Sequence, residues 1–124
     1  MNGRFILGAQ GAYYLATGTW AVAHRRSFEA VTGPKTDYWL VRTVGLLAAA
    51  IGGSLLVAAR RDRPSREAVS LAVAAGSAFS AVDVVGVAFR ILRPVYLGDA
   101  ALHLAAAAAA GRPRLLWSGA ARAA

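Results

Sequence analysis

The sequence predicts an all-α integral membrane protein, a four-helix transmembrane bundle with its N and C termini in the cytoplasm. Three observations support this prediction. The 124 residues are 57% hydrophobic and 16% charged, which is too apolar for a soluble domain of this size. The hydrophobic residues form four blocks, and the stretches between the blocks hold nearly all the charge. We therefore expect a single membrane domain over residues 1–124, surrounded by the lipid bilayer.

The first predicted helix covers residues 5–24 and carries no charged side chain. At ~1.5 Å of rise per residue it can cross a hydrocarbon core of ~30 Å. Its start also resembles a secretory signal, in which a basic residue precedes an apolar run and small residues mark a cleavage site. Gln10, Tyr13 and Tyr14 interrupt the apolar run, so we interpret the segment as a spanning helix.

A polar connection follows, in which Thr-Gly-Pro at 32–34 marks a turn and Phe28 and Val31 are suited to enter the membrane interface. The second predicted helix, 38–59, opens with a tyrosine and a tryptophan, which are typical of that interface. The third, 68–90, follows a proline and a serine that favour helix initiation.

The fourth predicted helix, 95–111, ends at a glycine and a nearby proline that act as a stop signal. Its six consecutive alanines are weakly hydrophobic for a lipid-facing surface, so we expect this helix to pack against protein. The tail, 112–124, either lies on the interface through its leucines and tryptophan or is loose.

The basic residues orient the helices. Eight arginines flank the helices on the side of the two termini, and five basic residues flank them on the other side. By the positive-inside rule both termini are cytoplasmic, in a multi-pass protein of the inner (plasma) membrane. The net charge of +8 follows from these flanking residues, which form no basic stripe with interleaved aromatics. We therefore expect no nucleic acid partner.

Motifs for cofactors are absent from the sequence. Without cysteine the chain can form neither a disulfide nor a thiolate metal site, and it contains no nucleotide-binding, zinc-hydrolase or serine-hydrolase motif. A haem held by His24 and His103 is disfavoured, because the first lies at the rim and the second near the centre of the bundle. We interpret His103 as a core histidine bonded to Asp99 or a tyrosine, and we expect no cofactor and no metal.

Four Arg, Asp and His residues lie within the predicted spans away from their ends, where each charge costs ~2.5 to 3.5 kcal/mol on insertion scales. Arg42, Asp83, Asp99 and His103 come from three helices and all fall in the predicted outer half, ~6 to 12 Å deep. Asp99 and His103 are four residues apart and share a helix face. Together these positions predict a polar cavity that opens toward the outer surface.

The faces that carry these charges also carry small residues, which mark close helix contacts in membranes. Arg42 shares its face with Gly45, Ala49 and Gly53, and Asp83 shares its face with Ser80 and Gly76. The first helix would present Gln10, Tyr14 and Thr17 to the same cavity.

Two interpretations of this polar layer are open. In the first, Arg42 forms a structural ion pair with Asp99 or Asp83 that sets the helix register. In the second the layer is functional, because one arginine cannot neutralise two aspartates unless His103 is protonated or one carboxyl keeps its proton. A neutral buried carboxyl can donate a proton, and the neighbouring His103 can accept one.

The leading hypothesis is a site that binds a lipophilic or amphiphilic small molecule and performs acid/base chemistry, such as isomerisation, cyclisation or hydrolysis. The alternatives are a proton-coupled transporter or exporter that works as a homodimer, and a structural accessory subunit; whether the chain is an enzyme stays open. The candidate catalytic residues are Asp83, Asp99 and His103, and the candidate ligand-binding residues are Arg42, Tyr14, Gln10 and Trp20.

The stretch from Phe28 to Leu47, FEAVTGPKTDYWLVRTVGLL, together with the four short helices, resembles small four-helix bacterial membrane proteins. This resemblance covers most of the chain and implies no activity. In size and helix number the chain is also similar to the small multidrug-resistance exporters, but Gln10 and two tyrosines stand where those exporters have a membrane-embedded glutamate. A looser likeness, used as an analogy, is to the emopamil-binding type of sterol isomerase, in which a membrane bundle encloses acidic residues and a histidine.

Overall fold

The computed structural model describes residues 3–112, and this part of the chain contains five α-helices and no β-strand. The all-helical class is therefore confirmed. Four helices correspond to the predicted ones, and a fifth lies within the predicted polar connection. Almost all of the predicted C-terminal tail lies outside the described residues. The helices are α1 (Gly3–Ala23), α2 (Arg25–Thr32), α3 (Tyr38–Ala59), α4 (Arg66–Ala88) and α5 (Val95–Ala110).

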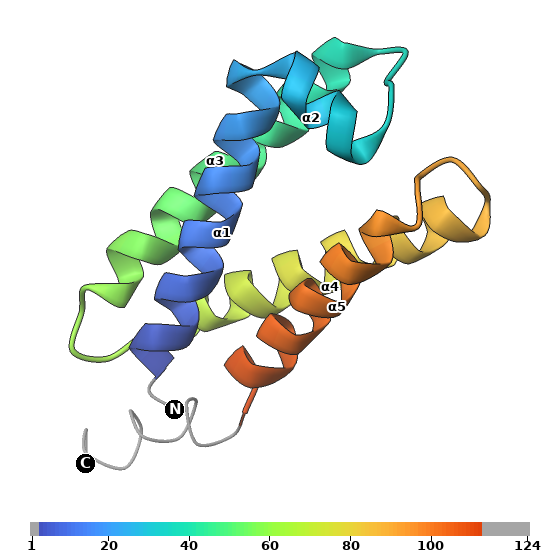
Figure 1. The fold of residues 1–124 in the computed structure, drawn as a ribbon. Helices are drawn as coiled ribbons and strands as arrows, with labels where there is room; N and C mark the ends of the chain where they lie inside the picture. The colour runs from blue at the N-terminus through green and yellow to red at the C-terminus, as the bar shows by residue number, and fades with distance from the viewer. Residues whose placement is uncertain (1–2, 113–124) are drawn as a thin grey trace.

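The helices associate as two antiparallel pairs, α1 with α3 and α4 with α5, and contacts between the pairs are sparse. Figure 1 shows the pairs meeting near the start of α1 and the end of α5 and diverging toward α2. Apolar residues from all four helices, among them Leu7, Leu55, Ala72 and Ala110, form the buried core where the pairs meet. A polar centre lies next to this core.

The α1/α3 pair is held by two glycine pairs with a seven-residue spacing on each helix. A Cβ on Gly52 would lie 2.5 Å from the carbonyl oxygen of Gly11, and a Cβ on Gly45 would lie 2.8 Å from the carbonyl oxygen of Gly18. These distances are far below van der Waals contact, so only glycine permits this approach of the two backbones.

The contact face of α3 differs from the one that the sequence predicted. We expected Arg42, Gly45, Ala49 and Gly53 to share the packed face, but Gly45, Ala48, Gly52 and Leu55 are the buried residues of this helix, together with its first residue. A Cβ on Gly53 would meet nothing within 4 Å. Both sets fit helical spacing, and the close approach of α1 selects the second one.

Helix α2 begins at a histidine cap that standard helix-start signals do not include. The Nδ1 atom of His24 accepts a hydrogen bond from the backbone N–H of Ser27 at 3.2 Å, and the Phe28 ring packs edge-on against the Trp20 ring with centroids 5.2 Å apart. The helix ends at Gly33, whose φ of 96° lies in the region that favours glycine.

An ion-pair network ties α2 to the segment after it. Glu29 accepts a hydrogen bond from the backbone N–H of Lys35 at 2.9 Å and pairs with Arg25 at 3.3 Å. These two partners hold the pKa of the Glu29 carboxyl below its ordinary value. The Lys35 ammonium lies 5.4 Å from the centre of the Tyr96 ring in α5, and burial lowers the pKa of Lys35. These contacts connect α2 to the second helix pair.

Two of the described helices, α3 and α4, are long and apolar enough to cross a membrane. Helix α5 is apolar but shorter, and the 21 residues of α1 include the polar residues of the buried centre. Length and composition therefore identify two candidate spans.

Candidate functional site: a buried aspartate, histidine and tyrosine centre

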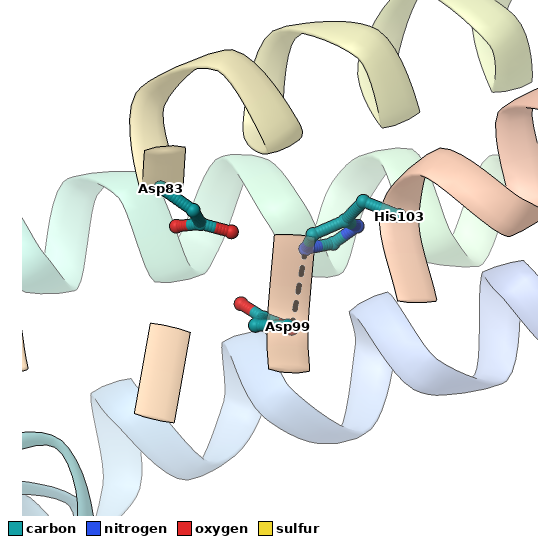
Figure 2. Close-up of side chains that lie close together, drawn as sticks. All are labelled: Asp83, Asp99 and His103. Atoms are coloured by element: carbon teal, nitrogen blue, oxygen red, sulfur yellow. Dashed lines mark ion pairs between the residues drawn. The ribbon is translucent and has the colours of Figure 1, made fainter. Parts of the chain in front are cut away.

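Asp83 of α4 and Asp99 and His103 of α5 form the centre of the candidate site, shown in Figure 2. The Nε2 atom of His103 lies 3.3 Å from the Oδ1 atom of Asp99, one helical turn earlier. One potential ligand atom from each of the three residues lies within 4.8 Å of the others. The prediction that Asp99 and His103 share one face is confirmed by this contact.

The first helix completes the centre with two adjacent tyrosines. The Tyr14 hydroxyl lies 3.2 Å from the Nδ1 atom of His103, and the Tyr13 hydroxyl donates a hydrogen bond to the Oδ1 atom of Asp99. Gln10 donates from its amide nitrogen to the Tyr14 hydroxyl at 3.0 Å and to the Ala72 carbonyl at 2.8 Å. The site thus joins α1 of one helix pair to both helices of the other.

These contacts assign a direction to each hydrogen bond. The Ala72 carbonyl can only accept, so the Gln10 amide nitrogen must face it, and the second N–H of that amide points at the Tyr14 oxygen. The Tyr14 O–H is then free to donate to Nδ1 of His103, which leaves the imidazole proton on Nε2, directed at Asp99. Each donor of this chain has an acceptor.

In this chain of hydrogen bonds the Gln10 Oε1 atom is buried without a hydrogen-bond partner within residues 3–112, and one oxygen of Asp83, outside the chain, is in the same state. Asp83 is 5% exposed, and its Oδ2 atom has no hydrogen-bond partner among the described residues. The nearby Ser80 hydroxyl donates instead to the Ala100 carbonyl at 3.0 Å. A buried ionised carboxylate without a partner is costly, and the negative charge of Asp99 beside it raises that cost. The Asp83 carboxyl therefore needs either a proton or a cation.

Small and aromatic residues shape the surroundings of His103. The Phe79 ring stacks on the imidazole with centroids 5.0 Å apart and an interplanar angle of 21°. A Cβ on Gly76 would lie 2.8 Å from the His103 carbonyl oxygen, so α4 and α5 are in close contact at this level. The predicted face of Gly76, Ser80 and Asp83 is buried in the structure. Packing therefore holds the imidazole in one orientation.

Of the seven predicted site residues, the structure brings five together, namely Gln10, Tyr14, Asp83, Asp99 and His103. It places the other two elsewhere. Trp20 donates from its indole nitrogen to the Ser27 hydroxyl at 2.7 Å. Tyr13 was not among the predicted site residues; its position beside Tyr14 in an apolar run was the available signal.

The exposed Arg42 side chain does not join the centre. Its guanidinium lies 5.3 Å from the centre of the Tyr38 ring, and within residues 3–112 neither Asp83 nor Asp99 has an arginine or lysine as an ion-pair partner. The predicted ion pair is therefore not formed, because the face of α3 that packs on α1 excludes Arg42. The two aspartates are left with His103 as their basic neighbour.

A comparison of the chain with models of known protein families, with curated proteins and with solved structures finds no match. Over residues 3–112 the fold and the site define an all-helical structure with two candidate membrane-spanning helices and a buried polar centre.

Proposed function

We propose that the chain is a multi-pass membrane protein in which α1, α3, α4 and α5 span the bilayer with both termini in the cytoplasm. Its polar centre would bind a lipophilic or amphiphilic small molecule and perform acid/base chemistry on it. The apolar outer surface supports the membrane part of the proposal, because such side chains are covered by lipid in a bilayer. Large exposed apolar residues include Trp39, Leu46, Leu47, Val82, Val84, Val85, Leu102 and Leu104.

The proposal of acid/base chemistry is supported by one observation, the different surroundings of the Asp83 and Asp99 carboxyl groups. Asp99 accepts hydrogen bonds from Tyr13 and from the imidazole N–H of His103, which stabilise its negative charge. Asp83 has an unpartnered buried oxygen, so its burial favours the neutral form of the carboxyl. Two carboxyls in different protonation states are what an acid/base site requires.

Roles follow from this contrast. Asp83 would donate a proton to the bound molecule, and Asp99 would accept one, with His103 adjusting the basicity of Asp99. Tyr14 would hold the imidazole through its Nδ1 atom. An isomerisation fits these roles most directly, because a proton is added at one atom and removed at another without net consumption.

The test of ligand binding is native mass spectrometry of the protein released gently from its own membrane. We expect a defined lipophilic molecule bound to the wild-type chain, and we expect Asp83→Asn and Asp99→Asn each to abolish its conversion while the helices still form. The matched control is Asp37→Asn, which changes an exposed aspartate outside the site. Full conversion by both site variants would contradict the proposed chemistry.

The membrane topology can be tested by cysteine labelling, because the native chain contains no cysteine. Pro34→Cys lies in the segment between α2 and α3, and Arg61→Cys lies between α3 and α4. In intact cells an impermeant thiol reagent should label position 34 and leave position 61 unlabelled until the membrane is opened. Equal labelling of both positions from outside would contradict the proposed topology.

One observation favours a second candidate, a proton-coupled transporter that works as a homodimer. The contacts of Tyr13 with Asp99 and of Tyr14 with His103 cross from one helix pair to the other, and the pairs otherwise touch sparsely. Movement of one pair against the other would break both contacts and release the carboxylates to titrate. A dimer in detergent and proton-coupled uptake in vesicles would support transport, and a strict monomer without uptake would exclude it.

A further inference from the structure

We propose that Asp83, Asp99 and His103 form a binding site for one divalent transition-metal cation of the Zn²⁺ type. The inference rests on the proposed function in that it uses the same buried centre and the same bound molecule, but it changes two roles. With the ion bound, Asp83 and Asp99 would both be charged ligands, so Asp83 would no longer be the proton donor. The inference replaces the sequence-based expectation of a site without metal.

Two of the three side chains already have the ligand spacing of such a site, and the third lies near them. Zinc binds imidazole nitrogen and carboxylate oxygen at about 2.0 to 2.2 Å, so two ligands of a tetrahedral ion lie about 3.3 to 3.6 Å apart. The Nε2 atom of His103 and the Oδ1 atom of Asp99 are 3.3 Å apart. The ligand atoms of all three residues lie within 4.8 Å of one another, so side-chain rotation of Asp83 would complete the set.

A second observation also points to a ligand. Asp83 is 5% exposed, and its Oδ2 atom has no hydrogen-bond partner among the described residues. Figure 2 shows the Asp83 carboxyl directed toward Asp99 and His103 rather than away from them. A buried carboxyl group that is directed toward a carboxylate and an imidazole, and that has one oxygen without a hydrogen-bond partner, is in the position of a metal ligand.

The charges of the centre favour a divalent ion. With both carboxyls ionised and a neutral imidazole the three residues carry two negative charges. No arginine or lysine forms an ion pair with either aspartate within the described chain. One divalent cation makes the centre neutral, which removes the large cost of uncompensated charge in a low-dielectric interior.

The ligand types and their number select the class of cation. Mg²⁺ and Ca²⁺ prefer six or more oxygen ligands, whereas a histidine nitrogen with two carboxylates suits Zn²⁺ and its transition-metal neighbours. Three protein ligands leave a fourth position open, as in catalytic zinc sites. The open position would take an oxygen atom of water or of the bound molecule.

The surrounding hydrogen bonds match the second layer of a metal site. Tyr13 donates to Asp99, and the Tyr14 oxygen lies 3.2 Å from the Nδ1 atom of His103. Metal-ligating histidines commonly place their other ring nitrogen against such a fixed partner. When Nε2 binds the metal, the imidazole proton must move to Nδ1 and point at the Tyr14 oxygen. Metal binding is therefore expected to change the tautomer of His103.

The test uses the full-length chain without an affinity tag, purified in detergent, with Co²⁺ as the probe and Zn²⁺ as the competitor. We expect one Co²⁺ per chain, and we expect the bound Co²⁺ to absorb visible light as an ion with four ligands does. Zn²⁺ should displace it. Asp83→Asn and His103→Gln should each weaken Co²⁺ binding by more than about 100-fold, and Tyr14→Phe should weaken it by about 10- to 100-fold. Asp62→Asn and His24→Gln, which change exposed residues, serve as matched controls and should bind as the wild type does.

A measurement on the wild-type chain covers the case in which a site variant does not fold. The chain has two histidines, so ¹⁵N NMR can resolve both imidazoles, and Zn²⁺ should convert His103 to the tautomer protonated at Nδ1. The inference is overturned if the folded wild type binds no Co²⁺, if Asp83→Asn binds it equally, or if only His24→Gln removes binding. A wild type that carries a lipophilic molecule but no metal overturns this inference alone, and one that binds metal but converts no lipophilic molecule overturns the proposed function alone.

Discussion

The two helix pairs use small residues for different purposes. In the α1/α3 pair, Gly11 and Gly52 bring two backbones together, and the contact is apolar. In the α4/α5 pair, Gly76 allows an equally close approach, but the same face continues into Ser80 and Asp83. The first pair is built for packing, and the second combines packing with a polar centre. Small residues alone therefore do not reveal which helix contact carries chemistry.

The first prediction breaks the packed pair and has the largest expected effect. Gly52→Val places a side chain against the Gly11 carbonyl oxygen, which would lie 2.5 Å from the new Cβ. Backbone atoms cannot yield as a flexible side chain can, so we expect a loss of about 3 kcal/mol in the free energy of unfolding. Denaturant titration in detergent measures it. Gly53→Val is the control, because its Cβ meets nothing within 4 Å; equal losses in both variants would show that backbone contact is not the cause.

The second prediction concerns the hydrogen bonds by which the two helix pairs are joined. Tyr14→Phe removes the hydroxyl that lies between Gln10 and His103 and leaves both groups buried without that partner. Unsatisfied buried groups of this kind cost about 1 to 3 kcal/mol, so we expect a loss near the middle of that range. Thermal unfolding monitored by circular dichroism checks it. Tyr13→Phe, which affects the half-buried Asp99, should cost less; the reverse order would contradict the assigned network.

The third prediction distinguishes a functional carboxyl from a structural one. Asp83→Asn replaces a buried group that has an unpartnered oxygen with a neutral side chain of nearly the same shape. In protein stripped of metal we expect the free energy of unfolding to rise by about 1 kcal/mol, because the folded chain no longer has to keep a buried carboxyl protonated at neutral pH. The same denaturant titration measures it, with Asp62→Asn as the exposed control. A large loss of stability would instead identify Asp83 as a structural residue.

The fourth prediction concerns α2, which lies outside both pairs, and has the smallest effect. The Lys35 backbone N–H and Arg25 lower the pKa of Glu29 below its ordinary value of 4.5, so the folded chain favours the charged carboxylate. The stability that the charged Glu29 carboxylate adds to the folded chain is present above pH 4.5. It is lost as the pH falls through the lowered pKa of Glu29 in the folded state. Acidification below pH 4.5 should therefore lower the protection factor of the Lys35 amide against hydrogen exchange while the helix pairs stay protected. Glu29→Gln should show this lower protection factor already at neutral pH; a protection factor equal to that of the wild type would contradict the assignment.

Sequence reasoning located most of the centre because burial of polar groups follows simple rules. Asp99 and His103 are four residues apart, and helical geometry alone places them on one face. Asp83, Gln10 and Tyr14 were selected because a polar group inside an apolar run needs a partner or a purpose. Arg42 is also a polar group inside an apolar run, but its side chain lies over the Tyr38 ring and not in the centre. A long arginine side chain can extend to the helix surface, so it does not need a buried partner.

The sequence by itself determined the helical class, four of the five helices and the residues that could form a polar centre, since hydrophobic blocks, stop signals and helical spacing are local properties. Only the tertiary structure decided which face of α3 packs on α1, that Tyr13 rather than Arg42 contacts Asp99, and that one buried oxygen of Asp83 has no hydrogen-bond partner in the described part of the chain. Those outcomes depend on how closely two backbones approach, and that distance is set by all the helices together. A pattern within one helix therefore cannot specify it.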